Sequence, residues 1–232
     1  MTLEVLADSD AVARRAAEII AAQARAAVMA RGRFVVALSG GRTPWAMLRT
    51  LSRMDVPWPG VHVVQVDERV APADHKDRNL THLGASLSVS RGSAHRVDPM
   101  PVEAPDLADA ARQYERTLAS VAGSPPVLDL VHLGLGADGH TASLVPGDPV
   151  LDIVDADVAL TGEYQGRRRM TLTYPILNRA RLVLWVVTGE DKAAMLVRLL
   201  RRDAGIPAGR VRQDRAIVLA DVAAAGSDGD AA

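Results

Sequence analysis

Glycine, aspartate and histidine follow one apolar run in the middle of the chain, and these residue types can carry acid–base chemistry. Val127 to Leu133 is mainly apolar and partly β-branched, which is typical of a buried strand. The residues after it are Gly134-Leu135-Gly136-Ala137-Asp138-Gly139-His140. Glycine lets a ligand approach the backbone closely, and histidine has the ordinary pKa nearest neutrality. The pattern predicts an active-site loop with His140 as general base beside the Asp138 carboxylate.

A second loop has the composition of an anion site. Phe34 to Leu38 is a short apolar strand, and Ser39-Gly40-Gly41-Arg42-Thr43-Pro44 leads from it into a helix expected over Trp45 to Arg53. Pro44 suits the first turn of that helix. Free backbone N–H groups and the positive helix end then point at the loop, which favours a phosphate. The loop is not a Walker A sequence, and an ordinary tight turn remains the alternative.

Charged residues follow one further predicted strand and precede another. Val61 to Val66 is followed by Asp67-Glu68-Arg69, and three charges at the end of a buried strand are uncommon unless they are paired or functional. A surface loop with an internal salt bridge is the alternative. Gly166 to Arg169 leads into a strand at Met170 to Thr173, and a guanidinium there suits a phosphate. Leu182 to Val187 is a further strand, which exits toward Lys192.

Strands and helices alternate along the chain, with helices expected from Asp8 to about Ala30 and over Leu107 to Val121. Because the strands are apolar runs, the sequence predicts an α/β fold: a doubly wound, mostly parallel sheet with helices on both faces. We expect one domain over residues 1–222 and a disordered tail over 223–232. Ligands bind outside the carboxyl ends of such strands. The loops that hold Ser39–Thr43, Asp67–Arg69, Asp138–His140 and Lys192 should therefore line one crevice.

Composition narrows the class of protein. The chain has 232 residues, with 48% hydrophobic and 24% charged residues, which is ordinary for a globular protein. Its net charge of −1 gives no basic field for nucleic acid or an anionic membrane. The absence of cysteine excludes disulfides and thiol chemistry and suits a reducing cytoplasm. No apolar run approaches a bilayer span, and the N-terminus lacks a secretion signal, so we expect a cytoplasmic protein.

Three other site classes fit poorly. Gly134-x-Gly136-x-x-Gly139 matches a dinucleotide fingerprint, but Asp138 stands where the pyrophosphate would approach. Asp138 and His140 lack a convincing third metal ligand, and the G-x-S-x-G elbow of a serine hydrolase is missing. The residues themselves therefore give little support for a dinucleotide site, a metal site or a serine nucleophile.

At these residues the chain resembles the 6-phosphogluconolactonases of the sugar-phosphate isomerase/deaminase-like superfamily. The resemblance covers nearly the whole chain, and its most specific part is the long central motif. It implies metal-free, cofactor-free hydrolysis of 6-phospho-D-glucono-1,5-lactone in the oxidative pentose phosphate pathway. The segments that carry it are Ser39-Gly40-Gly41, Asp67-Glu68-Arg69, Gly134 to Leu144 (GLGADGHTASL), Arg169 to Thr173 (RMTLT) and Gly189-Glu190-Asp191-Lys192.

The resemblance also assigns roles. His140 would activate water and later protonate the leaving ring oxygen, Asp138 would orient the imidazole, and Arg69 or loop N–H groups would stabilise the oxyanion. Asp67 and Glu68 would fix Arg69 and the sugar hydroxyls. Gly136 and Gly139 would support the site. The residues expected at the phosphate are Ser39, Gly40, Gly41, Arg42, Thr43, Arg169 and Lys192.

The nearest rival is a glucosamine-6-phosphate deaminase-like isomerase, which shares the central motif. That branch has an acidic residue before Pro-Gly, whereas Val145 stands there in this chain. A non-catalytic sugar-phosphate binding protein is the rival from another class. Arg42, Val64-Gln65-Val66 and Arg78 depart from the family pattern and bear on substrate fit. The assembly is expected to be a monomer or a small homo-oligomer.

Overall fold

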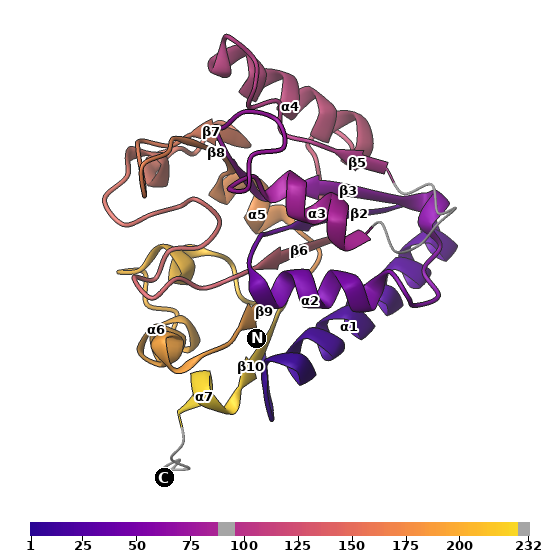
Figure 1. The fold of residues 1–232 in the computed structure, drawn as a ribbon, viewed down its shortest axis with the longest axis vertical. Helices are drawn as coiled ribbons and strands as arrows, with labels where there is room; N and C mark the ends of the chain where they lie inside the picture. The colour runs from indigo at the N-terminus through magenta and orange to yellow at the C-terminus, as the bar shows by residue number, and fades with distance from the viewer. Residues whose placement is uncertain (88–95, 227–232) are drawn as a thin grey trace.

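A parallel sheet forms the centre of the protein in the computed structural model, which describes residues 1–87 and 96–226 (Figure 1). Its seven strands run in the order β1-β10-β9-β6-β2-β3-β5, and every neighbouring pair is parallel. The predicted fold class is confirmed. The strands are β1 (Thr2–Leu6), β2 (Phe34–Leu38), β3 (Val61–Gln65), β5 (Arg96–Asp98), β6 (Leu130–Leu133), β9 (Val183–Val187) and β10 (Ala216–Asp221).

The sheet reverses its winding direction between β2 and β6. From β2 the chain moves outward through β3 to β5, then returns to place β6 on the other side of β2. Ligand sites of doubly wound sheets lie at such a switch point, outside the carboxyl ends of the strands. The loops after β2 and β6, which hold Ser39 and His140, therefore open on the same crevice.

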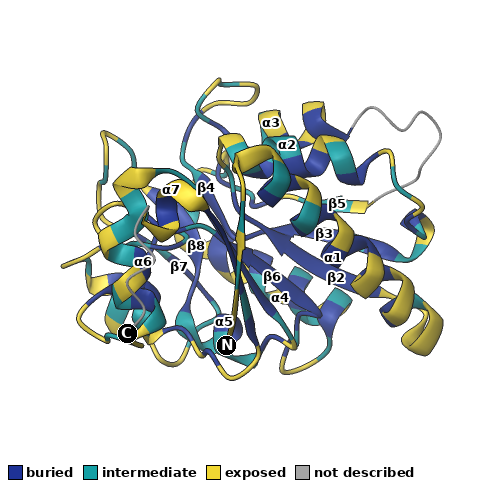
Figure 2. Cartoon of the chain, turned by 90° about the horizontal axis from the view of Figure 1, so that it is seen from below, coloured by how far each residue is buried: buried dark blue, intermediate teal, exposed yellow. Residues whose placement is uncertain are grey.

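Helices cover both faces of the sheet, and Figure 2 shows the strands buried between them. α1 to α3 pack on the face that Phe34, Val36 and Leu38 present, whereas α4 and α5 pack on the face that Val35 and Ala37 present. The helices are α1 (Ser9–Arg31), α2 (Arg42–Leu51), α3 (Asn79–Leu87), α4 (Leu107–Ala122), α5 (Tyr174–Arg179), α6 (Ala193–Leu200) and α7 (Val222–Ala225). Short 3-10 helices occupy Trp58–Gly60, Pro149–Asp152, Glu190–Lys192 and Pro207–Arg210.

Local signals explain where the predicted helices begin and end. The Asp8 side chain accepts a hydrogen bond from the Ala11 N–H at 2.7 Å and caps α1, which ends at Gly32 with φ +72°. α2 begins at Arg42, earlier than expected, and Pro44 is buried in its first turn. The predicted tail beyond Ala223 falls partly in α7, while residues 227–232 lie outside the described residues.

A second, antiparallel sheet crosses the carboxyl edge of the first. It has the order β4-β8-β7, with β4 (Asp67–Arg69), β8 (Arg169–Leu172) and β7 (Val158–Leu160). Val66 joins the sheets, since its N–H donates to the Leu38 carbonyl at 3.1 Å and its carbonyl accepts from the Leu172 N–H at 2.8 Å. The register places Arg69 opposite Arg169. Within the two described ranges, no helix is long and apolar enough to span a bilayer.

Candidate active site

The loop after β6 holds His140 and Asp138 as a hydrogen-bonded pair. His140 Nδ1 lies 2.5 Å from Asp138 Oδ1, and the His140 backbone N–H donates to the same oxygen at 3.1 Å. The loop is closed by the Gly136 N–H, which donates to the His140 carbonyl at 2.8 Å. A carboxylate at Nδ1 favours the tautomer whose free lone pair is on Nε2. The imidazole is 25% exposed, so a water molecule can reach it.

Asp138 is held as an anion. Burial raises the pKa of its carboxyl, but hydrogen bonds from the His140 backbone and imidazole and from Tyr164 outweigh burial, so the pKa lies below its ordinary value. The Tyr164 hydroxyl donates to Asp138 Oδ2 at 3.2 Å. At neutral pH the Asp138 carboxylate can therefore orient the imidazole and stabilise its cation.

His140 and the Ser39-Gly40-Gly41 turn line the same cavity. This cavity, which we call the catalytic pocket, has a volume of about 190 Å³. It brings together eight of the predicted site residues with four others that sequence reasoning did not assign. The predicted ones are Ser39, Gly40, Gly41, Asp67, Arg69, Gly136, His140 and Arg169, and the others are Asn79, Gly134, Leu135 and Ala142.

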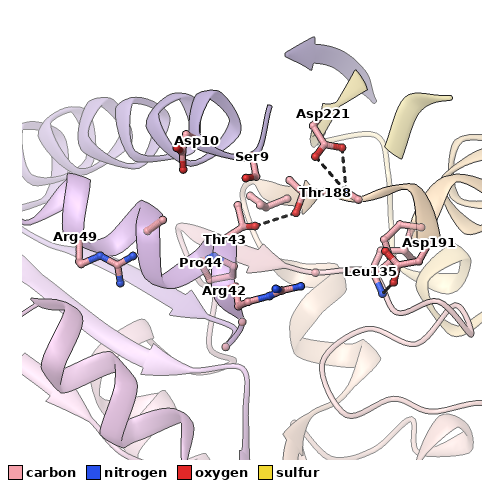
Figure 3. Close-up of a pocket in the computed structure, with 17 residues that line it drawn as sticks. Ser9, Asp10, Arg42, Thr43, Pro44, Arg49, Leu135, Thr188, Asp191 and Asp221 are labelled. Atoms are coloured by element: carbon pink, nitrogen blue, oxygen red, sulfur yellow. Dashed lines mark hydrogen bonds and ion pairs between the residues drawn. The ribbon is translucent and has the colours of Figure 1, made fainter. Parts of the chain in front are cut away.

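A larger recess of about 600 Å³ adjoins the catalytic pocket and shares Gly40, Gly41, Gly134 and Leu135 with it (Figure 3). We call it the lysine recess, because Lys192 lines it together with Arg42 and Thr43. The Arg42 side chain extends from α2 into it, as Figure 3 shows. Lys192 Nζ lies 2.7 Å from Asp191 Oδ2, and the Thr43 and Thr188 hydroxyls are 2.9 Å apart. The predicted phosphate residues are thus divided between two adjoining cavities.

Arg169 is a buried cation with a free donor. Its side chain is 5% exposed, and its Nε has no hydrogen-bond partner among the described residues. Its Nη2 donates to Gln165 Oε1 at 3.2 Å, and its guanidinium lies 5.0 Å from the centre of the Tyr164 ring. Burial lowers the pKa of Arg169, Asp67 raises it and Arg69 lowers it, with a net decrease. A buried, unpaired N–H of a cation is suited to an anionic ligand.

Arg69, on β4, lies opposite Arg169 on β8. Its Nη1 donates to Asn79 Oδ1 at 2.7 Å and to the Asp77 carbonyl at 3.1 Å. Asp67 accepts from the Ser143 hydroxyl at 2.6 Å, which ties β4 to the loop that follows His140. These contacts fix the position of the guanidinium without neutralising its charge by a carboxylate.

Glu68 supports the loop that follows β4. It is fully buried, and its Oε1 accepts the backbone N–H groups of Arg69 and Asn79, each at 2.8 Å. Its Oε2 accepts from Gln65 Nε2 and the Leu80 N–H, each at 2.8 Å, and lies 3.2 Å from Arg78 Nε. With both oxygens satisfied by protein donors, Glu68 acts on the site through the backbone of its neighbours.

Ser39 is also directed into the protein. Its hydroxyl donates to the His132 carbonyl at 2.9 Å, and its N–H donates to His132 Nδ1 at 3.3 Å. Burial lowers the pKa of His132 to about 4, so its neutral ring can accept that bond. Gly40 has no room for a side chain, since a Cβ would lie 2.1 Å from Asn79 Oδ1, and Gly41 has φ +133°. The turn therefore needs its glycines, and its donors toward a ligand come from residues after Ser39.

Sequence reasoning missed several residues of the site. Tyr164 and Asn79 have no motif around them, and His132 is hidden within the strand that precedes the central motif. Two other histidines lie beside the site: His75 is half-buried, and the exposed His82 stacks on Trp45 with ring centres 5.4 Å apart. No cluster of three potential metal-binding side chains occurs within residues 1–87 and 96–226.

The family match and the related proteins of known sequence agree with each other. Residues 7–219 match the family described as glucosamine-6-phosphate isomerases/6-phosphogluconolactonase. The 6-phosphogluconolactonase of Synechocystis is 36% identical over 208 residues, covering 87% of this chain and 86% of that protein. The rat 6-phosphogluconolactonase is 38% identical over 197 residues, covering 78% of this chain and 75% of the rat protein.

Solved structures share the fold. The 6-phosphogluconolactonase of Trypanosoma brucei superposes with a TM-score of 0.85 at 25% identity, over 97% of each chain. A monomeric glucosamine-6-phosphate deaminase superposes with a TM-score of 0.82 at 18% identity, over 97% of this chain and 99% of that one. The fold is thus common to both branches, and the choice between them rests on the site.

Proposed function

The chain belongs to the glucosamine-6-phosphate isomerase/6-phosphogluconolactonase family, and we propose that His140 is the general base of its lactonase reaction. The protein is a 6-phosphogluconolactonase: it hydrolyses 6-phospho-D-glucono-1,5-lactone to 6-phospho-D-gluconate in the oxidative pentose phosphate pathway. The observation that carries the proposal is that His140, whose Nδ1 lies 2.5 Å from Asp138 Oδ1, lines one cavity with the glycine turn and Arg169.

The reaction needs a base, an oxyanion site and an acid. His140 Nε2 takes a proton from water as the oxygen attacks C1 of the lactone, and Asp138 stabilises the resulting imidazolium. The carbonyl oxygen of the tetrahedral intermediate becomes negative, and Arg69, which lines the same cavity, is placed to stabilise it. When the intermediate collapses, the C1–ring oxygen bond breaks and His140 returns the proton to that oxygen.

The phosphate binds where the two cavities meet. A dianion needs cations and N–H donors, and the Gly40–Gly41 turn at the start of α2 separates Arg169 from the lysine recess. Lys192, Arg42 and Thr43 contact the phosphate from the recess, and the unpaired Arg169 Nε contacts it from the catalytic pocket. Lys192 exchanges its exposed partner Asp191 for the phosphate on binding.

Two rival functions are disfavoured. Val145, at the position where the deaminase branch carries an acidic residue, is buried and apolar and cannot transfer a proton. A binding protein without activity has no need for an imidazole held against a carboxylate. A cytoplasmic location and an assembly no larger than a small homo-oligomer stay predictions.

The test is hydrolysis of freshly generated 6-phosphogluconolactone in a pH-stat, corrected for spontaneous hydrolysis. The wild-type protein should turn the lactone over and release no ammonia from glucosamine 6-phosphate. His140→Ala should reduce turnover to the uncatalysed rate while its thermal unfolding stays near wild type. His62→Ala is the matched control, because His62 lies at the amino end of β3 and pairs with Asp98 at 3.3 Å. Full activity of His140→Ala would remove His140 from the mechanism.

A further inference from the structure

The connection between β7 and β8 brings a tyrosine to the active site. Tyr164 and Arg167 form an isolated antiparallel bridge, with N–H to carbonyl distances of 3.0 and 3.3 Å. Between them, Gln165 and Gly166 have φ +53° and +74°, the left-handed conformation that a tight hairpin turn of this kind requires. The hairpin therefore fixes the direction in which Tyr164 leaves the backbone.

Tyr164 contacts three residues of the proposed mechanism. Its hydroxyl donates to Asp138 Oδ2 at 3.2 Å, while Asp138 Oδ1 is bound to His140. Its ring meets the His140 ring in an edge arrangement, with centres 5.6 Å apart and planes at 64°. The Arg169 guanidinium lies 5.0 Å from the ring centre. One side chain thus contacts the orienting carboxylate, the base and a phosphate ligand.

We propose that Tyr164 is a positioning residue of this lactonase: its hydroxyl fixes the Asp138 carboxylate, and its ring fixes the His140 imidazole and the Arg169 guanidinium. The proposal rests on the proposed function, because it assigns Tyr164 a task only if His140 is the base. Burial and the charge of Asp138 raise the pKa of Tyr164, so its hydroxyl stays protonated and can donate throughout the pH range of the reaction.

The Tyr164 hydroxyl controls the orientation of the Asp138 carboxylate and how strongly that carboxylate stabilises the imidazolium form of His140. The terminal torsion of an aspartate is broad, so a carboxylate bound at one oxygen alone can rotate away from its partner. A hydroxyl donor also withdraws part of the negative charge that would otherwise stabilise imidazolium. Removing it should weaken the alignment of His140 and leave more of the Asp138 charge free to stabilise the imidazolium.

The other charges near the pair stay constant when Tyr164 changes. Asp67 and Arg69 face the pocket from β4, and Arg169 faces it from β8. Tyr164→Phe keeps the ring over Arg169 and against His140 and removes only the hydroxyl. Tyr164→Leu removes the ring as well, so the pair of variants separates the two roles.

The experiment compares both variants with wild type in the pH dependence of lactone hydrolysis. Tyr164→Phe should lower kcat about five-fold with little change in KM and move the acid limb of kcat/KM upward by about half a pH unit. Tyr164→Leu should also raise KM for the phosphorylated lactone about five-fold, because Arg169 loses its aromatic contact. Tyr174→Phe is the matched control: its hydroxyl donates to the Pro207 carbonyl at 3.0 Å, and its loss should leave the acid limb in place.

The outcomes separate the two proposals. A wild-type protein without lactonase activity overturns the proposed function itself. Active wild type with a Tyr164→Phe variant of unchanged kcat and acid limb overturns the positioning role alone. Thermal unfolding of each variant guards against a folding defect, and if Tyr164→Leu is unstable, Tyr164→Phe still decides the role of the hydroxyl.

Discussion

Gly136 makes a direct test of whether the position of His140 matters, because an added methyl group would strike the His140–Asp138 pair. A Cβ at Gly136 would lie 2.1 Å from His140 Nδ1, 2.3 Å from its Cε1 and 2.6 Å from Asp138 Oδ1. An ordinary contact of a Cβ begins near 3.4 Å, so the imidazole of a Gly136→Ala variant must move by more than 1 Å.

The cost of this substitution falls on the site and not on the backbone. Gly136 is not among the glycines with positive φ, so alanine can adopt its conformation without strain. A displacement of about 1 Å at a reacting group can cost about 100-fold in rate. We therefore expect Gly136→Ala to lose about 100-fold in kcat while its free energy of unfolding changes little.

The assay combines turnover of 6-phosphogluconolactone, thermal unfolding and the NMR signals of the His140 imidazole ring. Gly134→Ala is the matched control in the same loop, since a methyl group there meets no protein atom within 4 Å. The His140 signals of Gly134→Ala should match those of wild type, whereas those of Gly136→Ala should be displaced. A folded Gly136→Ala variant with more than a third of wild-type turnover would refute the claim that this His140–Asp138 geometry drives the reaction.

Two further predictions concern the cations and the buried carboxylate. Arg169→Ala and Lys192→Ala should each raise KM for 6-phosphogluconolactone about ten-fold or more and leave unphosphorylated gluconolactone less affected, since each removes a charge-assisted bond to phosphate. Equal losses on both lactones would contradict the phosphate assignment. Glu68→Gln should lower the free energy of unfolding by about 2 kcal/mol, because it removes the buried carboxylate that lies 3.2 Å from Arg78 and leaves that guanidinium with only the half-exposed Glu103, at 2.7 Å. Urea unfolding of that variant tests this, and an unchanged midpoint would show that Glu68 is not essential to the loop.

Local signals in the sequence were sufficient for the central strands β2, β3, β6 and β9 of the parallel sheet and for their loops, but not for β1 and β5 at its edges. β2 spans the predicted Phe34–Leu38, and α1 begins and ends at the residues that cap it. The rule that parallel strands direct their carboxyl ends to one edge was enough to gather Ser39, Asp67 and His140 around one cavity. These features depend on short-range patterns and on chain direction, and both can be read directly from the sequence.

The second sheet could not be predicted, because only β8 carries a local strand signal and its partners β4 and β7 do not. β4 is three residues long and wholly charged, and its stability comes from β8, about a hundred residues later. Strand propensity does not reveal such a pairing. Tyr164 was missed for the same reason: its importance comes from a hairpin between β7 and β8, whose existence depends on the pairing of those strands.

The parallel sheet and the antiparallel sheet supply different groups to the site, and where they meet two arginines repel each other. The parallel sheet delivers the base and the glycine turn, while the β4–β8 register sets Arg69 opposite Arg169. Like charges across neighbouring strands destabilise a sheet, and the lowered pKa of Arg169 reflects both its burial and the charge of Arg69. Asp67, Asn79 and the Tyr164 ring offset this repulsion only in part, since Arg169 Nε keeps no partner among the described residues. An anionic substrate therefore gains from relieving a repulsion built into the fold, in addition to the hydrogen bonds it forms.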